Sequence, residues 1–339
     1  MKTLQLIQLL RFVAAFLVVL SHSAYLLGLH QSVSAQLSYA FAFGNVGVHI
    51  FFVISGFIMV FTTFGPRAKQ IGPTEFLRRR FVRIYPIYWI YAGLTLSIMA
   101  QKLSGYEIAA AAVLWPPYSS TIIGQGWTLT YEVAFYLCFA AIIPMGMLRG
   151  LSALTITFVI LVALHPLVPA GPVWQVVTNP LIFEFLFGAW LGAAFARAPK
   201  WPSGRLLLSI ALALLMVGFL AGYNRAPSVA VWGIPAAILV GGALGLEREH
   251  ARWAAKIAFL GDSSYSLYLL RALILGALFS IARPSAHPVT TCIVFSGIAI
   301  AAAMPPYYLV ELQIVRLFAA RQSGWKWSVN QDERASPGS

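Results

Sequence analysis

The sequence predicts an all-α fold, a bundle of about ten membrane-spanning helices with both chain ends in the cytoplasm. Three observations support this prediction. Hydrophobic residues make up 60% of the 339 residues and charged residues only 10%, with a mean hydropathy of +0.79, which excludes an ordinary soluble domain. The apolar residues fall into runs that approach or exceed the roughly 20 residues needed to cross a bilayer. Lysine and arginine are concentrated in alternate loops, as in other multi-spanning membrane proteins.

Ten spans can be drawn along the chain. Pro305 and Pro306 interrupt the last of them, where we expect a kink or an interfacial end because proline cannot donate a helical hydrogen bond. The segment 101–126 is too short and too rich in proline to span, and is expected to be an outer loop with an interfacial helix. Residues 1–321 are predicted to form one domain, and the polar tail 322–339 is predicted to be disordered. The predicted spans are 6–29, 44–64, 76–100, 127–147, 150–168, 179–197, 205–223, 227–246, 259–281 and 288–318.

The charge distribution sets the predicted orientation. With the N-terminus inside, eighteen of the 23 lysines and arginines fall on the inner side and three on the outer side, while Arg11 and Arg271 lie within spans. This asymmetry places both termini in the cytoplasm. The net charge of +13 is therefore spread over inner loops, so the expected partner is the lipid bilayer and not nucleic acid.

The first span carries two polar residues that are expensive to hold in lipid, Arg11 and His22. Eleven residues correspond to almost three helical turns, so the two side chains lie on one stripe, within about 20° of each other. They are separated by roughly 16 Å along the helix axis. One polar line is therefore predicted to run from near the inner membrane face towards the outer one.

Five ionisable residues from five spans are predicted to lie at comparable depth in the outer half of the membrane: His22, His49, Glu132, Glu184 and Arg271. Such residues usually face a bundle interior and are functional candidates. The alternative is a set of structural ion pairs in which Glu132 or Glu184 neutralises Arg271. His22 is the best candidate for proton transfer, because neutral imidazole can take a proton from a hydroxyl near physiological pH. A packed histidine that donates to a backbone carbonyl is the competing interpretation.

The third span begins with an arginine cluster in the run FLRRRFVRIYPIYW. Arg79 and Arg83 are four residues apart and share one face, with Arg80 close by. Guanidinium groups at a cytosolic helix N-terminus bind phosphates well, because their forks pair with phosphate oxygens and the helix dipole helps. Coenzyme A carries such phosphates, so an acyl-CoA donor fits. Anchoring by positive charge or contact with anionic lipid would explain the same cluster.

Five motifs together resemble the membrane-bound acyltransferase-3 family. Arg11 and His22 match its first-helix pattern, in which ten residues separate an arginine from a histidine. The others are GVHIFFVISGF in the second span, the arginine-rich run of the third, GWTLTYEVAFYL in the fourth and SYSLYLLR in the ninth. Two positions depart from the pattern: His49 stands where the family has an acid, and Arg271 where it has a histidine. The opening run is most similar to the exopolysaccharide-acylating branch, although Phe12 follows the arginine where that branch often has glycine.

The resemblance implies a bacterial inner-membrane O-acyltransferase. It would move an acyl group, expected to be acetyl, from cytosolic acyl-CoA to a hydroxyl of an exported or cell-surface polysaccharide or its lipid-linked precursor. His22 is the candidate general base or acyl carrier, and Glu132 the second catalytic candidate, which orients or tunes the site. No bound cofactor and no metal is expected, because no cluster of histidine, cysteine and carboxylate has ligand spacing; acyl-CoA is a co-substrate. The candidate substrate-binding residues are Arg11, Arg79, Arg80, Arg83, Tyr85, Trp127, His49 and Arg271.

Two other classes of function remain open at this point. The charged groups could line the path of a transporter or flippase for a glycolipid or polysaccharide precursor, although the broken helices and inverted repeats typical of that class are not evident. The protein could also be an enzyme, such as a polymerase, that uses a lipid-linked sugar without coenzyme A. Consumption of acyl-CoA by the purified protein separates the leading hypothesis from both.

Overall fold

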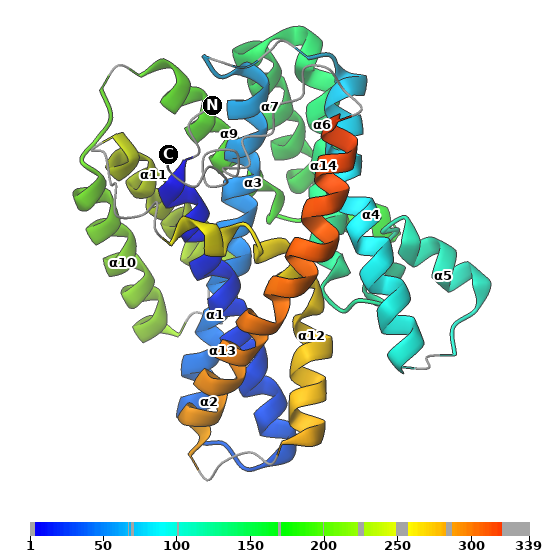
Figure 1. Cartoon of the computed structure of the whole chain (residues 1–339). Coiled ribbons are helices and arrows are strands. Elements are labelled where there is room, and N and C mark those ends of the chain that lie inside the picture. Colours follow the sequence, from blue (N-terminus) through cyan, green and yellow to red (C-terminus); the bar gives the residue numbers. More distant parts are fainter. Residues whose placement is uncertain are drawn as a thin grey trace, which may run out of the picture.

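The structure is a computed structural model, which describes residues 4–66, 68, 71–99, 102–168, 171–198, 200–222, 227–248, 257–282 and 287–320. These residues form a bundle of α-helices (Figure 1), and no strand occurs among them. The helices are α1 (Gln5–His30), α2 (Ala35–Ala42), α3 (Val46–Phe64), α4 (Pro73–Met99), α5 (Gly105–Ala112), α6 (Gly126–Ile142), α7 (Met147–Leu164), α8 (Pro172–Val177), α9 (Ile182–Arg197), α10 (Gly204–Ala221), α11 (Ile234–Arg248), α12 (Ser264–Ile281), α13 (Pro288–Pro306) and α14 (Leu312–Ala320).

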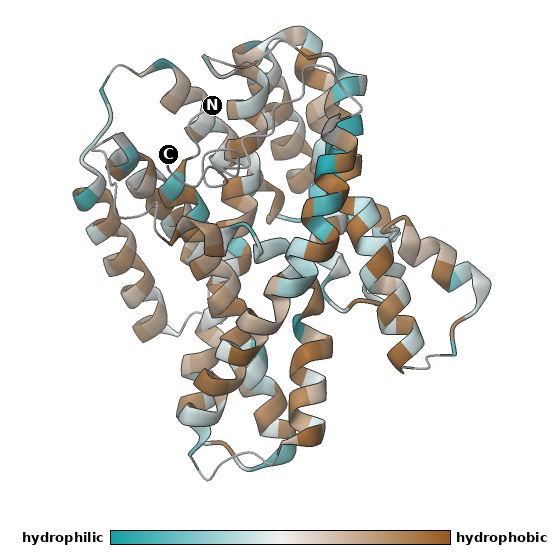
Figure 2. Ribbon diagram, in the orientation of Figure 1, coloured by the Kyte–Doolittle hydropathy of each residue, from teal (hydrophilic) through white to brown (hydrophobic). Residues whose placement is uncertain are grey.

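The predicted all-α membrane bundle is confirmed. Within the described residues, nine helical segments are long and apolar enough to cross a membrane. The predicted span 179–197 corresponds to α9, whose 16 residues extend only about 24 Å, short of the roughly 30 Å hydrocarbon core. Hydrophobic residues predominate along most helices, and a group of hydrophilic residues lies along α14 (Figure 2). The predicted tail 322–339 lies outside the described residues.

Helix α1 lies at the centre of the bundle and contacts α3, α11, α12 and α13. The carboxylate of Glu247, near the end of α11, accepts hydrogen bonds from the backbone N–H groups of Gln5 and Leu6 at 2.8 and 2.7 Å. These two N–H groups belong to the first turn of α1, which has no helical acceptor for them, and a negative charge is favourable there. Glu247 therefore anchors the start of the central helix.

Glycines allow α3 to approach helices on two sides. A Cβ atom at Gly56 would lie 1.9 Å from the Phe185 carbonyl oxygen, and one at Gly188 would lie 1.8 Å from the Val53 carbonyl oxygen. The backbones of α3 and α9 are therefore in direct contact, as small residues permit in membrane helices. Gly47 lies equally close to the Ala14 carbonyl of α1. This packing fixes the relative heights of α1, α3 and α9.

Two irregular regions were anticipated, and each takes a specific form. At the expected interruption, α13 continues through Pro305 and Pro306, and a π-helical turn, η9 (Tyr307–Glu311), then joins it to α14. The segment 101–126 contains the expected short helix, α5. Its C-terminal end packs against the middle of α4, where Tyr88 Oη and Trp89 Nε1 donate to the carbonyls of Ala111 and Ala112 at 2.9 and 2.8 Å.

The α3–α9 contact yields a stability prediction. Gly188→Ala should lower the unfolding midpoint in detergent by the equivalent of about 3 kcal/mol or more, because a methyl group would overlap the Val53 carbonyl. Gly276→Ala in α12 is the matched control, since a Cβ there meets nothing within 4 Å. A thermal unfolding scan of both variants tests the prediction, and equal midpoints would contradict it.

The cytoplasmic placement of both termini stays a prediction. Reporter fusions after Gln36, Arg67, Pro172 and Lys200 should alternate between outside, inside, outside and inside, because basic residues are retained on the cytoplasmic side. Paired alkaline phosphatase and fluorescent protein fusions at each position measure this. A cytosolic signal at Pro172 would overturn the proposed topology.

Candidate functional site

His22 lies on the face of α1 that packs against α12. Its Nδ1 is 2.8 Å from the carbonyl oxygen of Val18, one turn earlier in the same helix. A carbonyl oxygen only accepts hydrogen bonds, so Nδ1 carries the proton and donates it. In the neutral ring the lone pair therefore resides on Nε2. This nitrogen is 3.2 Å from an Nη of Arg271, which donates to it. His22 therefore donates to a backbone carbonyl through Nδ1 and still has a lone pair on Nε2 that can accept a proton, so the two interpretations from the sequence are compatible.

The Arg271 guanidinium is buried, with 3% of the residue surface exposed. Its other Nη donates to the Tyr268 carbonyl at 2.9 Å, and its carbon lies 4.4 Å from the centre of the Tyr268 ring. The alternative interpretation, an ion pair between Arg271 and Glu132 or Glu184, is not found among the described residues, where Glu184 contacts His49 and Glu132 contacts Ser55 and Tyr136. Arg271 instead contacts the candidate base.

The start of α6 holds this part of α12 in place. The side-chain amide of Gln125 donates to the carbonyls of Tyr268 and Leu269 at 2.8 and 2.9 Å. Thr128 and the Tyr268 hydroxyl share a hydrogen bond of 2.6 Å. Tyr268, which underlies the Arg271 guanidinium, is therefore fixed at both its carbonyl and its ring. The position of Arg271 relative to His22 depends on these contacts.

His49 forms a second, separate pair. Its Nδ1 lies 2.6 Å from a carboxylate oxygen of Glu184, and its ring is stacked on Trp232 with a centroid separation of 5.6 Å. Trp232 belongs to a π-helical turn, η6 (Val229–Gly233), that precedes α11. Glu184 is fully buried, and Gly233 packs directly against it. Glu184 of α9 therefore places a carboxylate directly beside His49, the position at which the family pattern has an acid.

Glu132 does not reach His22. Its carboxylate accepts a hydrogen bond from Ser55 Oγ at 2.6 Å and another from the Tyr136 hydroxyl. Ser55 is six residues beyond His49 in α3, which places Glu132 roughly 9 Å further towards the C-terminal end of that helix. His49 itself lies almost three turns from His22 along α1, because α3 runs antiparallel to α1 and Gly47, two residues before His49, is level with Ala14. The five predicted groups therefore lie at three levels, His22 with Arg271, then His49 with Glu184, then Glu132, and not in one layer.

The arginine cluster of α4 divides into two pairs. Arg78 and Arg79 both bind the Glu75 carboxylate, each with a contact of 2.6 Å. Arg80 turns into the bundle, where it donates to Thr62 Oγ1 at 3.0 Å and lies over the rings of Phe76 and Tyr136. Arg83 also interacts with interior groups. Of these four arginines, Arg80 and Arg83 therefore interact with polar residues in the bundle interior.

Arg11 belongs to an inner polar cluster that sequence reasoning found only in part. It donates to Gln8 at 2.9 Å, and Gln8 donates to Asp262 at 3.0 Å. Arg11 also interacts electrostatically with Arg83 and with Glu311, a residue of η9. The Glu311 carboxylate accepts a hydrogen bond from Ser266 Oγ at 2.6 Å. Glu311 was missed, and the available signal was a lone carboxylate five residues after a Pro–Pro break in an apolar span.

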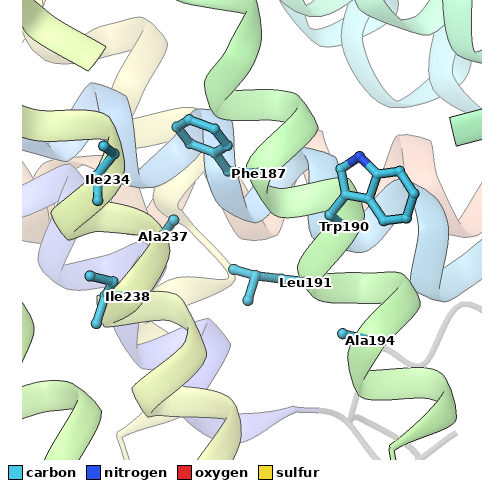
Figure 3. A pocket seen from close by; sticks show the side chains of 7 residues that line it. All are labelled: Phe187, Trp190, Leu191, Ala194, Ile234, Ala237 and Ile238. Atoms are coloured by element: carbon cyan, nitrogen blue, oxygen red, sulfur yellow. The ribbon is translucent and has the colours of Figure 1, made fainter. Parts of the chain in front are cut away.

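The remaining candidates, Tyr85 and Trp127, have their contacts outside the His22–Arg271 pair and outside the polar cluster around Arg11. Tyr85 Oη donates to the Val113 carbonyl at 3.3 Å, and Trp127 is 40% exposed and packs against Phe52 and Tyr131. An apolar groove of about 390 Å³ runs between α9 and α11, lined by residues such as Phe187, Leu191 and Ile234 (Figure 3). Among the described residues, no three histidine, cysteine or acidic side chains gather in a metal-binding arrangement.

Comparisons with known proteins agree with this architecture. A family model described as "Acyltransferase domain" matches residues 5–305. The chain is 33% identical over 250 residues to the exopolysaccharide production protein ExoZ of Rhizobium meliloti (strain 1021), covering 68% of this chain and 76% of that protein. It is 26% identical over 285 residues to the acyltransferase MdmB of Streptomyces mycarofaciens, covering 72% of each.

A third relative is Nodulation protein 10 of Rhizobium leguminosarum bv. viciae, which is 26% identical over 315 residues, covering 80% of this chain and 83% of that protein. No solved structure matches the chain. The family match extends over most of the bundle, including α1, α3, α4, α6 and α12, which carry the motifs. The chain therefore belongs to the membrane-bound acyltransferase-3 family and is a multi-pass membrane acyltransferase.

Proposed function

We propose that this acyltransferase moves an acyl group, in the simplest case acetyl, from cytosolic acyl-CoA to a hydroxyl of an exported or cell-surface polysaccharide or its lipid-linked precursor. Such a reaction would take place in the bacterial inner membrane, which separates cytosolic acyl-CoA from the exported acceptor. The observation that carries the proposal is the arrangement of His22, whose unprotonated Nε2 faces the buried cation Arg271 inside the bundle. The likeness to an exopolysaccharide production protein supports a sugar acceptor.

The chemistry follows from the tautomer of His22. The acceptor hydroxyl attacks the thioester carbonyl carbon and gives its proton to Nε2, while the carbonyl π electrons move onto oxygen. Collapse of the tetrahedral intermediate breaks the carbon–sulfur bond, and the departing thiolate takes the proton from Nε2. The products are an ester and free coenzyme A. In the second route Nε2 attacks the thioester and displaces the coenzyme A thiolate, which leaves an acyl-imidazolium; the hydroxyl then takes the acyl group, and its proton passes to the thiolate.

The inner polar cluster supplies the matching donor site. Arg11, Arg80 and Arg83 converge from α1 and α4, and bidentate guanidinium contacts suit the phosphates of coenzyme A. Arg11 and His22 are on the same helix, roughly 16 Å apart along its axis. A pantetheine arm extended along α1 would therefore carry the thioester from the arginines towards His22. The acceptor would approach His22 from the opposite side of the membrane.

The first functional prediction concerns His22. His22→Ala and His22→Gln should reduce acyl transfer by about 10²–10⁴-fold, the usual contribution of general acid–base catalysis. Coenzyme A release by purified protein, measured with a thiol reagent in the presence of oligosaccharide acceptors, tests this. Acyl-enzyme trapping with radiolabelled donor then separates the base from the carrier route.

His30→Ala is the matched control, because His30 is an exposed histidine at the end of the same helix and packs only edge-on against Phe279. It should retain turnover. If both His22 variants fold, as judged by their unfolding midpoints, and still turn over at a near-normal rate, the assigned proton transfer is wrong.

The second functional prediction concerns donor binding. Arg80→Ala and Arg83→Ala should raise KM for acyl-CoA with a smaller fall in kcat, because phosphate contacts far from the reacting carbonyl contribute equally to the ground and transition states. Lysine should rescue only in part, since it keeps the charge but loses the planar fork. Steady-state kinetics at two salt concentrations measure both effects.

Arg78→Ala is the control for general surface charge, because Arg78 is exposed and paired with Glu75. Its KM should change less than that of either interior variant, and Arg79→Ala should resemble it. If alanine at positions 79, 80 and 83 leaves KM unchanged, the cluster is only a positive anchor for the membrane.

A further inference from the structure

Arg271 is a buried cation without a carboxylate partner among the described residues. Its two Nη atoms donate to the Tyr268 carbonyl and to His22, and its Nε has no partner in the described chain. A buried charge that lacks compensation usually destabilises a protein. The fold nevertheless holds the guanidinium firmly through Tyr268, Thr128 and Gln125. This arrangement resembles a preorganised site for negative charge that is present only during reaction.

The contact with His22 has a direct chemical consequence. Nε2 has a single lone pair, and at 3.2 Å the Arg271 N–H group occupies it. An acceptor hydroxyl needs the same lone pair to give up its proton. Arg271 and the hydroxyl therefore compete for one position, and the guanidinium must shift before the base can act. Because its other Nη is tethered to the Tyr268 carbonyl, the shifted group stays beside the reacting atoms.

We propose that Arg271 caps the base at rest and binds the oxyanion during transfer, an inference that rests on the proposed function. When donor and acceptor are bound, the Nη group leaves Nε2 and donates to the thioester carbonyl oxygen. The acceptor hydroxyl then forms the new carbon–oxygen bond and gives its proton to Nε2, and the carbonyl oxygen carries the negative charge against Arg271. When the carbon–sulfur bond breaks, the carbonyl re-forms, the departing thiolate takes the proton from Nε2, and the guanidinium can return to the freed lone pair.

The test combines substitution with chemical rescue. Arg271→Ala should lower kcat by about 10²–10³-fold, as removal of one oxyanion donor does, with a smaller change in KM for acyl-CoA. Arg271→Lys should recover part of the loss. Slow donor hydrolysis without acceptor should fall in parallel, because it passes through the same oxyanion. Added guanidinium at millimolar concentration should partly restore Arg271→Ala and should not restore His22→Ala.

Gln125→Leu is the structural control, because it removes the other donor to the Tyr268 carbonyl. It should lower the unfolding midpoint, and guanidinium should not restore any lost activity. Equal kcat in wild type and Arg271→Ala would overturn the inference, as would losses that Gln125→Leu reproduces and guanidinium leaves unchanged. If Arg271→Ala does not fold, Arg271→Lys decides: unaltered kcat overturns the role. Wild-type protein that releases no coenzyme A from acyl-CoA instead rejects the proposed function itself.

Discussion

The bilayer interior offers no water to a polar group, so each ionisable side chain of this bundle must find its partners within the protein. Glu184 is bound to His49, and Glu132 to Ser55 and Tyr136. These pairings leave Arg271 without an acid among the described residues. Its partner is the candidate base itself. The chemistry proposed for the site therefore depends on how the carboxylates are distributed over the bundle.

Helix packing determines that distribution. Close glycine contacts hold α3 against α1 on one side and α9 on the other, so α3 sets the height of its neighbours. His49, near the start of α3, meets Glu184 of α9, whereas Ser55 meets Glu132 nearer the C-terminal end of α3. His22 faces α12 instead. The acids thus bind side chains of α3, and the site at His22 keeps its uncompensated cation.

The membrane bundle, most helix positions and the family could be predicted from the sequence, because hydropathy and motif spacing are local properties. Depth was estimated from residue counts, which ignore helix tilt and the actual packing level. That is why Glu132 was predicted at the same depth as Arg271, although its partners are Ser55 and Tyr136. The inward turn of Arg80 and the position of Glu311 depend on helix rotation and on a π-helical turn. Neither property is encoded in a simple periodic pattern.

The structure also bears on which histidine is the better base. His49 is oriented by a carboxylate, an arrangement that usually favours proton acceptance by the other ring nitrogen. However, acyl transfer needs a cation or N–H donor beside the reacting carbonyl as well as a base. Arg271 supplies that group at His22, whereas His49 faces Glu184 and the Trp232 ring. A carboxylate beside the developing oxyanion would repel it, so the pairing of base and cation favours His22.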